Sequence, residues 1–428
     1  MLTSNTHRKL FLPLFFLFVI FIHKNSIAQP GTQWTKDGAH ILESDEGQIM
    51  EIDVKNPSQP KVLIDRAALT PQGKEPLKIR FFRFSDDNKK VLIYTNSKRV
   101  WRYDTRGDYW VYDTEKKTLK QLGKGRPESS LMFAKFSADG SKVAYVSEHN
   151  IYVEDVATNQ IRQLTQDGTS RLINGTFDWA YEEEFDCRDG FRWAPDGKSI
   201  AYWQIDARKI RNYLMLNTTD STYSFNVPVE YPKAGTDPSS CRVGVVDISS
   251  AKTTWMNVPG DAVQHYITRM EWADNPNEII LEQLNRAQTE SKIIVCDIKS
   301  AKAKTIHTET DKAWIDGKSR WNDGDPVGWE WIEKGKAFLW VSEKDGWRHV
   351  YRIDRNGKEK LLTPGEYDVI TISRIDEAHK NLYVIASPEN ATQKYLYKIS
   401  MDGGKPQRLT PASESGTHDY DISPTGSV

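Results

Sequence analysis

A short pattern that recurs along the whole chain is the feature that most constrains its fold. The clearest copies are residues 136–140 (Phe-Ser-Ala-Asp-Gly) and 193–197 (Trp-Ala-Pro-Asp-Gly), and an apolar segment rich in β-branched and aromatic residues follows each. Weaker copies start at Trp34, Phe84, Trp272, Trp331, Ile375 and Ile422. Successive copies lie mostly about 40–60 residues apart, and β-rich repeats of this length are typical of propeller blades.

The chemistry within each repeat indicates a four-stranded antiparallel unit. Asp-Gly favours a tight turn, because glycine tolerates positive φ and aspartate bonds its own backbone. Short strands such as 150–155 and 160–165 follow the turn in one of the clearest units. A β-sandwich or a solenoid is the alternative, but long, irregular units favour a propeller. We therefore predict an all-β fold, an eight-bladed β-propeller with irregular blades.

Two irregularities modify this prediction. The longest interval follows Trp193 and includes residues 223–235, so we expect an inserted arm at about 206–240. The eighth copy begins near Asp421 and the sequence ends at Val428, so the last blade is expected to be incomplete. Because an open propeller exposes unpaired strand edges, the sequence is expected to be a fragment of a longer protein, unless a natural truncation ends it here.

The sequence lacks the motif of an α/β-hydrolase. Such an enzyme needs Gly-x-Ser-x-Gly at a strand-to-helix turn, with an acid and a histidine later in the chain. The nearest approach, residues 197–201 (Gly-Lys-Ser-Ile-Ala), is a hairpin turn of the repeat. We predict no α/β-hydrolase domain and no catalytic residue in this chain, which alone should be inactive.

Composition excludes other classes of function. The net charge is −1 and no basic cluster stands out, so a nucleic-acid partner is not expected. The nine histidines are scattered, and the three cysteines are Cys187, Cys241 and Cys296. Since none of these residues shows metal-ligand spacing, we predict no metal and no cofactor.

The N-terminus has the pattern of a secretory signal peptide. Basic residues at 7–9 precede an apolar run over 10–22, and Ser26-Ile27-Ala28 offers small residues for cleavage. A retained membrane anchor is the alternative, but the run is short of the roughly 20 residues needed to span a bilayer. We predict a signal peptide over 1–28 and a mature propeller over 29–428, exported to the periplasm or the extracellular space.

An acidic cluster at residues 178–185 (Asp-Trp-Ala-Tyr-Glu-Glu-Glu-Phe) is the strongest candidate site. Three adjacent acidic residues usually lie on a solvent-exposed face. Here, however, they are flanked by aromatic residues that should be buried. Carboxylates next to buried aromatic rings need a cation to balance their charge. A primary ammonium has three hydrogen-bond donors, enough to bind two carboxylates. Adjacent residues of a strand point to opposite faces, so two neighbouring carboxylates can converge on one cation only if the segment is a short helix or is irregular.

This cluster resembles the double-glutamate motif of the dipeptidyl peptidase IV family. The resemblance implies that Glu183 and Glu184 clamp the free amino terminus of a peptide, with Tyr181 beside them in the substrate-binding set. Trp101-Arg102-Tyr103 resembles the family segment whose arginine bonds a substrate carbonyl, which implies that role for Arg102. Without the resemblance, stacking of Arg102 on Trp101 is the simpler interpretation.

The resemblance extends over the mature chain, although this chain is poorer in cysteine than vertebrate members. It implies a serine exopeptidase that removes N-terminal dipeptides with proline or alanine second, acting through an appended or missing hydrolase domain. The arm resembles a dimer contact, which implies a possible homodimer. Two alternatives stay open: a non-catalytic exported propeller that binds peptides or a protein, and the propeller of a prolyl tripeptidyl peptidase.

Overall fold

The structure, a computed structural model, describes residues 33–317 and 329–426, and antiparallel sheet dominates it. Consecutive strands form a meander in most sheets. The first sheet has four strands: β1 (Gln33–Trp34), β2 (His40–Asp45), β3 (Gln48–Asp53) and β4 (Lys61–Ile64). The predicted signal peptide lies outside the described residues.

The next two repeats join into one eight-stranded sheet. The joint is β7, whose residues Arg106 and Gly107 pair with Met132 and Leu131 of β9. The strands are β5 (Phe81–Phe84), β6 (Lys90–Val100), β7 (Tyr103–Asp113), β8 (Thr118–Gln121), β9 (Leu131–Phe136), β10 (Lys142–Ser147), β11 (Asn150–Asp155) and β12 (Ile161–Gln163).

The fourth repeat is a five-stranded sheet that carries a helix and a separate hairpin. Its strands are β13 (Leu172–Asn174), β14 (Phe191–Trp193), β15 (Ser199–Asp206), β18 (Ser240–Asp247) and β19 (Thr253–Trp255). The helix is α1 (Trp179–Phe185), and the hairpin is formed by β16 (Asn212–Asn217) and β17 (Phe225–Glu230).

Three four-stranded sheets complete the described fold. The fifth contains β20 (His265–Trp272), β21 (Glu278–Asn285), β22 (Glu290–Asp297) and β23 (Ala303–Thr310). The sixth contains β24 (Glu330–Ile332), β25 (Ala337–Ser342), β26 (His349–Asp354) and β27 (Glu359–Leu361). The seventh contains β28 (Val369–Asp376), β29 (Asn381–Ala386), β30 (Tyr395–Ser400) and β31 (Gln407–Arg408).

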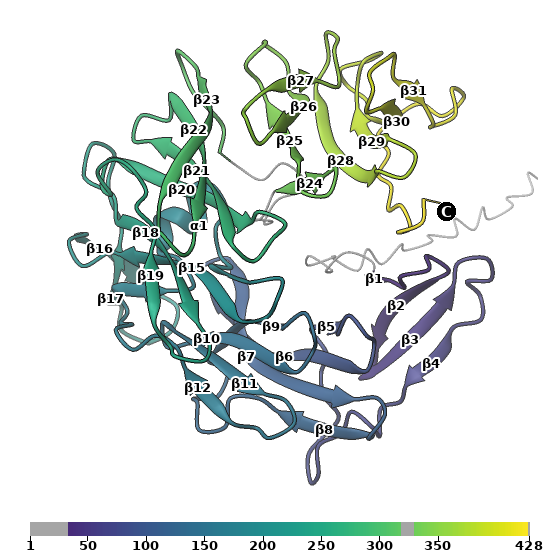
Figure 1. Cartoon of the computed structure of the whole chain (residues 1–428). Helices are drawn as coiled ribbons and strands as arrows, with labels where there is room; N and C mark the ends of the chain where they lie inside the picture. Colours follow the sequence, from purple (N-terminus) through teal and green to yellow (C-terminus); the bar gives the residue numbers. More distant parts are fainter. Residues whose placement is uncertain (1–32, 318–328, 427–428) are drawn as a thin grey trace, which may run out of the picture.

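The sheets stand around a ring, with the first strand of each unit toward the centre and the last toward the rim (Figure 1). The prediction of an all-β repeat fold with four-stranded units is therefore confirmed. The count of eight blades and the lack of a hydrolase domain stay predictions.

The recurring pattern forms the turn after the first strand of a unit. In the unit of β9, the Ser137 hydroxyl donates to the Asp139 carboxylate at 2.6 Å, and Asp139 also accepts the Ser141 amide at 3.0 Å. These hydrogen bonds lower the pKa of Asp139 to about 2. Thr35 and Asp37 repeat the contact in the first unit, and Ser85 and Asp87 repeat it in the second. The turn is therefore encoded locally.

The tryptophans of the pattern bind neighbouring units to one another. The indole N–H of Trp193 donates to the backbone carbonyl of Lys135 at 3.1 Å, and that of Trp272 donates to Arg192 at 3.1 Å. Trp331 donates to the carbonyl of Trp272 in the same way, at 3.0 Å. Each indole thus satisfies a carbonyl at the end of the preceding unit's first strand.

The eighth copy of the pattern lies between the seventh unit and the first. The indole N–H of Trp34 donates to the Asp421 carboxylate at 2.9 Å, and the Arg374 guanidinium donates to the Ser423 carbonyl at 2.8 Å. Residues at the two ends of the described chain are therefore neighbours in the ring.

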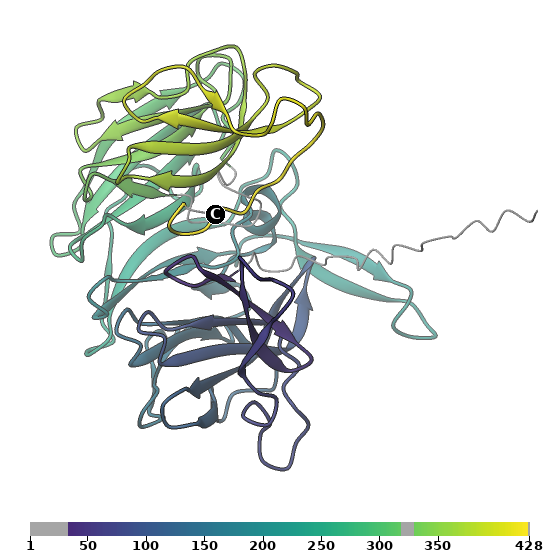
Figure 2. The same ribbon diagram turned by 90° about the vertical axis from the view of Figure 1, so that its right-hand side faces the viewer.

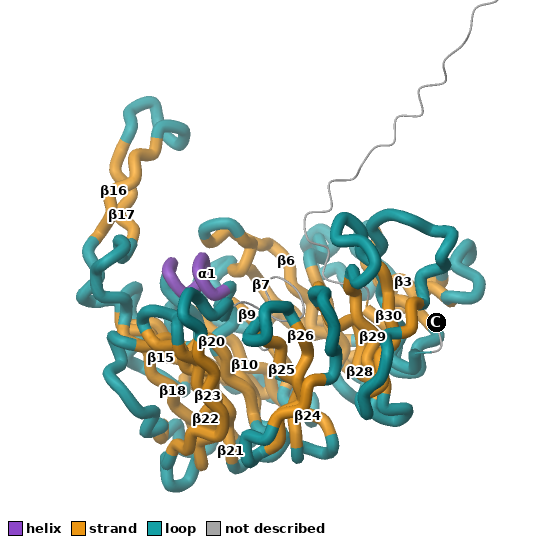
Figure 3. Tube along the Cα trace, turned by 90° about the horizontal axis from the view of Figure 1, so that it is seen from above, coloured by secondary structure: helices purple, strands orange, loops and turns teal. Residues whose placement is uncertain are grey.

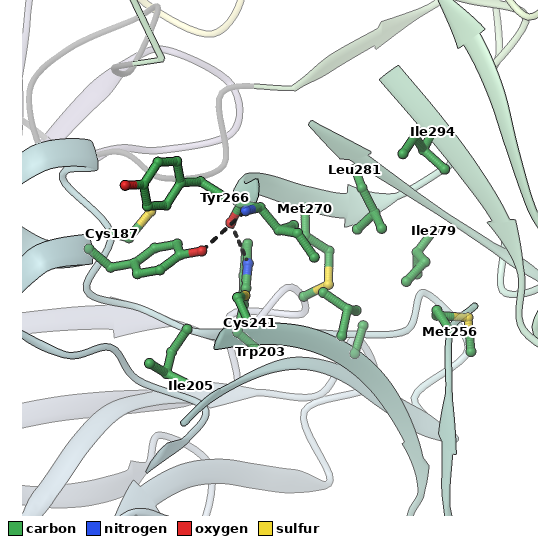
Figure 4. Packing of buried hydrophobic residues seen from close by; sticks show 14 of the residues in the cluster. Cys187, Trp203, Ile205, Cys241, Met256, Tyr266, Met270, Ile279, Leu281 and Ile294 are labelled. Carbon is green, nitrogen blue, oxygen red and sulfur yellow. Dashed lines mark hydrogen bonds between the residues drawn. The ribbon is translucent and has the colours of Figure 1, made fainter. Parts of the chain in front are cut away.

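A large buried cluster joins the fourth and fifth sheets (Figure 4). Trp203 and Cys241 come from the fourth sheet, whereas Met270, Leu281 and Ile294 come from the fifth. The indole N–H of Trp203 crosses between the sheets and donates to the Ile267 carbonyl at 2.9 Å. All three cysteines are buried and free. This packing lies directly beneath α1, whose Tyr181 and Phe185 belong to the same cluster.

Both irregular segments of the fourth sheet emerge near one face of the ring. Figure 3 shows α1, the end of the β6–β7 hairpin and the β16–β17 hairpin at this face. The β16–β17 hairpin projects well away from the sheets (Figure 2) and lies within the range predicted for the arm. Its exposed apolar side chains include Leu214, Leu216, Tyr223 and Phe225.

Candidate functional site

The candidate site is built on an interruption of the innermost strand of the fourth sheet. β13 and β14 both pair with β15, and residues 175–190 leave and rejoin the sheet between them. The Gly190 amide donates to the Gly175 carbonyl at 3.0 Å and closes the base of this excursion. A Cβ on Gly190 would lie 2.6 Å from the Gly175 carbonyl carbon, so the close approach requires glycine.

Asp178 fixes the start of α1. Its carboxylate accepts the Tyr181 amide at 3.1 Å, as an N-cap residue does, and also accepts the Ser239 hydroxyl at 2.5 Å. Burial raises the pKa of Asp178, against the opposing effect of these two bonds. Ser239 immediately precedes β18, so one carboxylate joins the helix to the base of the arm.

A second contact between α1 and the arm is aromatic. The rings of Trp179 and Tyr231 lie 4.1 Å apart, and the ring of Tyr213 lies 5.7 Å from that of Tyr231. The orientation of α1 is therefore coupled to the arm as well as to the sheet.

Tyr181 supports the helix from below. Its side chain is 1% exposed, and its hydroxyl accepts the Ile267 amide of β20 at 3.2 Å. Its ring packs against Phe177, Phe185 and Tyr266. The Arg269 guanidinium also donates to the Phe185 carbonyl at 3.1 Å, so the last turn of α1 is held too. Because Tyr181 is shielded from solvent, it can influence the glutamate side chains only by positioning the helix that carries them.

The three glutamates of α1 have different surroundings. Glu182 is buried, the Glu183 side chain is 14% exposed, and Glu184 is exposed. The segment forms a short helix, one of the two conformations expected for it, so Glu183 and Glu184 are not forced to opposite faces as they would be on a strand. Only some of the acidic run is available to a ligand from solvent.

The structure brings Arg102 and Glu183 together, although 81 residues separate them in sequence. The Arg102 Nε donates to the Glu183 carboxylate at 2.9 Å, and the arginine side chain is nevertheless 72% exposed. Arg102 sits in the turn between β6 and β7. Because a guanidinium has five N–H donors, most of those on Arg102 remain for a ligand.

Glu184 lies near Tyr266 and Arg286. Burial raises the pKa of Tyr266, Arg286 opposes that rise, and Glu184 adds to it, so all three residues share one neighbourhood. The Arg286 guanidinium lies 5.6 Å from the Tyr266 ring and donates to the Thr236 carbonyl at 3.2 Å. No local sequence pattern points to Tyr266, because its approach to α1 depends on how the fourth and fifth sheets pack.

These contacts define a polar surface with an acidic centre. Glu183 and Glu184 can accept hydrogen bonds from a cation, and Arg102 can donate to a carbonyl or carboxylate oxygen. Within residues 33–317 and 329–426, no cluster of histidine, cysteine and carboxylate side chains could hold a metal ion. The same ranges contain no helix long and apolar enough to cross a membrane.

Comparison with protein families gives a match over most of the chain. The family described as "Dipeptidyl peptidase IV (DPP IV) N-terminal region" matches residues 85–428.

Curated relatives include a probable dipeptidyl-aminopeptidase B of Tuber melanosporum, 26% identical over 92% of this chain and 47% of the relative. A probable dipeptidyl peptidase 4 of Aspergillus fumigatus is 24% identical over 91% of this chain and 50% of the relative. The chain thus spans about half the length of the curated relatives it matches.

Among solved structures, the crystal structure of Porphyromonas gingivalis dipeptidyl peptidase 4 superposes with a TM-score of 0.83. It is 26% identical, and the match covers 92% of this chain and 55% of that one. A putative dipeptidyl aminopeptidase IV from Bacteroides ovatus shares the fold, with a TM-score of 0.71 at 19% identity over the same 92% of this chain.

Proposed function

Because this chain belongs to the family of the dipeptidyl peptidase IV N-terminal region, we propose that it is the peptide-recognition propeller of a serine exopeptidase of that type. Its relatives are dipeptidyl peptidases by name. In this proposal the propeller holds the amino terminus of a peptide, and an α/β-hydrolase domain cleaves after the second residue, proline or alanine. Binding energy then contributes to catalysis mainly by fixing the scissile bond.

The α1 carboxylates are the proposed receptor for the peptide ammonium. Glu183 and Glu184 supply acceptors, and a primary ammonium has three donors to fill them. Each charge-assisted hydrogen bond contributes roughly 1.5–3 kcal/mol. Tyr181 takes part only by holding the helix on the fifth sheet.

The contact between Arg102 and Glu183 is the observation that carries the proposal. It places a donor-rich, exposed guanidinium directly beside one carboxylate of the receptor. An N-terminal residue carries its ammonium only a few bonds from its first carbonyl oxygen. Carboxylate and guanidinium side by side therefore complement both groups of one peptide end.

The proposal extends to the number of blades, the oligomeric state and export. The place of Ile422 between the seventh unit and the first supports a ring of eight units. Exposed apolar side chains on the β16–β17 hairpin support its use as a homodimer contact. Export by a signal peptide over 1–28 to the periplasm or outside the cell rests on the sequence pattern alone.

Calorimetric titration of the chain with matched peptides tests the proposal. A tripeptide with a free amino terminus is expected to bind, and its N-acetylated form is expected to bind roughly tenfold or more weakly, because one charge-assisted contact is lost. Glu183→Gln should remove most of that difference, while Glu43→Gln on the exposed face of β2 should retain it. Equal affinity of the free and acetylated peptides for the unaltered chain would contradict the proposal.

A further inference from the structure

A cavity of about 290 Å³ lies behind α1, on the side of β7 and β9. Residues of the β6–β7 turn, β9, the excursion around α1 and β17 line it, and neither Arg102, Glu183 nor Glu184 does. Its volume is near the lower limit of about 300 Å³ for small-molecule pockets. The cavity is therefore separate from the proposed peptide receptor, although α1 contributes to both.

Three buried polar atoms on its walls have no hydrogen-bond partner in the described structure. They are Thr105 Oγ1, Glu182 Oε1 and Arg188 Nη1. Glu182 is only 6% exposed, and the Arg188 side chain is only 10% exposed. Arg188 makes an ion pair at 3.6 Å with Asp186, too long for a hydrogen bond. A buried polar atom without a hydrogen-bond partner destabilises the folded state, so three such atoms around one cavity indicate a ligand.

The backbone around the cavity is strained at three bulky residues. Trp101, Phe133 and His149 all have positive φ, at 52°, 54° and 63°, and all three line the cavity. Bulky residues rarely adopt this conformation, and such strain is concentrated at functional sites. Here it positions aromatic side chains as part of the wall.

We propose that this cavity binds a free α-amino acid with an apolar side chain. Glu182 and Thr105 accept hydrogen bonds from its ammonium, and Arg188 donates to its carboxylate. The apolar side chain packs against Phe133 and the neighbouring Met132, Ile173 and Phe177. The two charges of a zwitterion complement those of Glu182 and Arg188, and the remaining apolar wall matches a hydrocarbon side chain.

The protonation of Glu182 gives an independent signature. Burial raises the pKa of Glu182 to about 7, with Arg188 opposing and Glu183 adding to the rise. Burial also lowers the pKa of His149 and raises that of Asp178 on other walls of the cavity. The further charged residues lining it are Arg106 and Glu230. A bound ammonium favours ionised Glu182, so binding near pH 7 should release protons and should weaken at pH 5.

Calorimetry of the full chain with L-leucine, L-leucinol and N-acetyl-L-leucine tests this assignment. Leucinol lacks the carboxylate and N-acetyl-leucine lacks the ammonium, so each should bind at least about tenfold more weakly than leucine. Titration in buffers of different ionisation enthalpy should show proton release for leucine near pH 7. No binding of leucine, or equal binding of the three compounds, would overturn the proposal and leave a water-filled cavity.

Two variants connect the binding to the cavity. Glu182→Gln keeps the shape and should lose leucine binding by tenfold or more, and Thr105→Val should weaken it without a change in charge. Glu115→Gln, at an exposed ion pair with Lys89, is the matched control and should bind leucine normally. Unchanged binding in both cavity variants would refute the site.

The test also separates this site from the peptide receptor. Glu183→Gln should weaken peptide binding far more than leucine binding, because Glu183 does not line the cavity. The dipeptide Leu-Leu should bind the cavity more weakly than leucine, since its second residue exceeds the volume. Tighter binding of the dipeptide in the Glu183→Gln variant would contradict the amino-acid assignment.

Discussion

The fourth and fifth sheets differ in what interrupts them. In the fifth sheet, β20 to β23 follow one another as a simple meander. In the fourth, α1 interrupts the innermost strand, and the arm is inserted between β15 and β18. Yet β15 and β18 pair without a register shift from Ser199↔Asp247 to Asp206↔Ser240. The comparison teaches that a blade can carry polar insertions at its strand ends while its ladder and core stay regular.

Two buried glutamates, one in the fifth sheet and one in the insertion of the fourth, differ in their hydrogen bonding. Glu282 of the fifth sheet accepts hydrogen bonds from the Thr268 hydroxyl at 2.7 Å and the Ser291 hydroxyl at 3.1 Å. Glu182 of the insertion has a buried oxygen without a partner. Two hydroxyls therefore satisfy the buried Glu282, whereas Glu182 keeps an unsatisfied oxygen, as residues of ligand sites do.

The largest predicted effect is a pH dependence of stability that Glu182 confers. Its folded-state pKa of about 7 exceeds the ordinary 4.5, so between these values the folded protein binds more protons than the unfolded one. This stabilisation is fully present below pH 4.5 and is lost as pH rises through 7, by about 3 kcal/mol at most. Glu182→Gln should therefore be more stable than the unaltered chain at pH 8, as measured by urea unfolding.

Glu282→Gln is the control from the regular sheet. It replaces a carboxylate that two hydroxyls already satisfy, so it should destabilise the chain at pH 8. Stabilisation by both substitutions would show that the hydrogen bonds of Glu282 do not distinguish it from Glu182.

The next largest effect is expected at the base of the excursion. Gly190→Ala forces a Cβ against the Gly175 backbone and should cost about 1–3 kcal/mol in the free energy of unfolding. Gly73→Ala, where no atom lies within 4 Å, should cost only about 1 kcal/mol for its positive φ. Denaturant unfolding of both variants compares them, and equal costs would show that the close approach is unimportant.

Loss of the helix cap is expected to have a smaller effect on stability but to affect the site. Asp178→Ala removes the N-cap and the contact with Ser239, at a cost of about 1–2 kcal/mol. Ser239→Ala removes only the second contact. Peptide affinity should fall more in Asp178→Ala than in Ser239→Ala, as measured by calorimetry, because only the first variant frees the start of α1. A larger loss of peptide affinity in Ser239→Ala than in Asp178→Ala would show that the contact with the base of the arm, rather than the N-cap, orients α1.

The smallest effect is expected for the aromatic contact between arm and helix. Tyr231→Ala removes a ring 4.1 Å from that of Trp179 and should cost about 0.5–1.5 kcal/mol beyond lost burial. Tyr223→Ala at the exposed part of the arm should cost nothing measurable, since this side chain is 85% exposed. Thermal unfolding of the two variants distinguishes them, and equal melting temperatures would show that the arm and α1 are independent.

Local sequence predicts the repeated parts of this molecule well. The turn after β9 depends on Ser137, Asp139 and Gly140, which are adjacent in the chain, so its conformation is visible in the sequence. The sequence also predicts that residues 178–185 leave the strand conformation, because adjacent strand residues point to opposite faces, but it does not distinguish the helix α1 from an irregular segment.

Long-range contacts in the site could not be derived from local sequence. The resemblance to a known family, rather than spacing, placed Arg102 in the same site as Glu183. The sequence also could not show which faces of α1 would be buried. The resemblance implies a place for Tyr181 in the substrate-binding set, whereas in the structure Tyr181 packs against β20 and is buried beneath α1.

A crystal structure of the chain with a bound tripeptide that has a free amino terminus tests the central claim most directly. We predict that the peptide nitrogen lies within hydrogen-bonding distance of the Glu183 and Glu184 carboxylates, with Arg102 donating to the peptide. A peptide bound with its amino terminus away from α1, or with its carboxylate against Arg102, would contradict the claim.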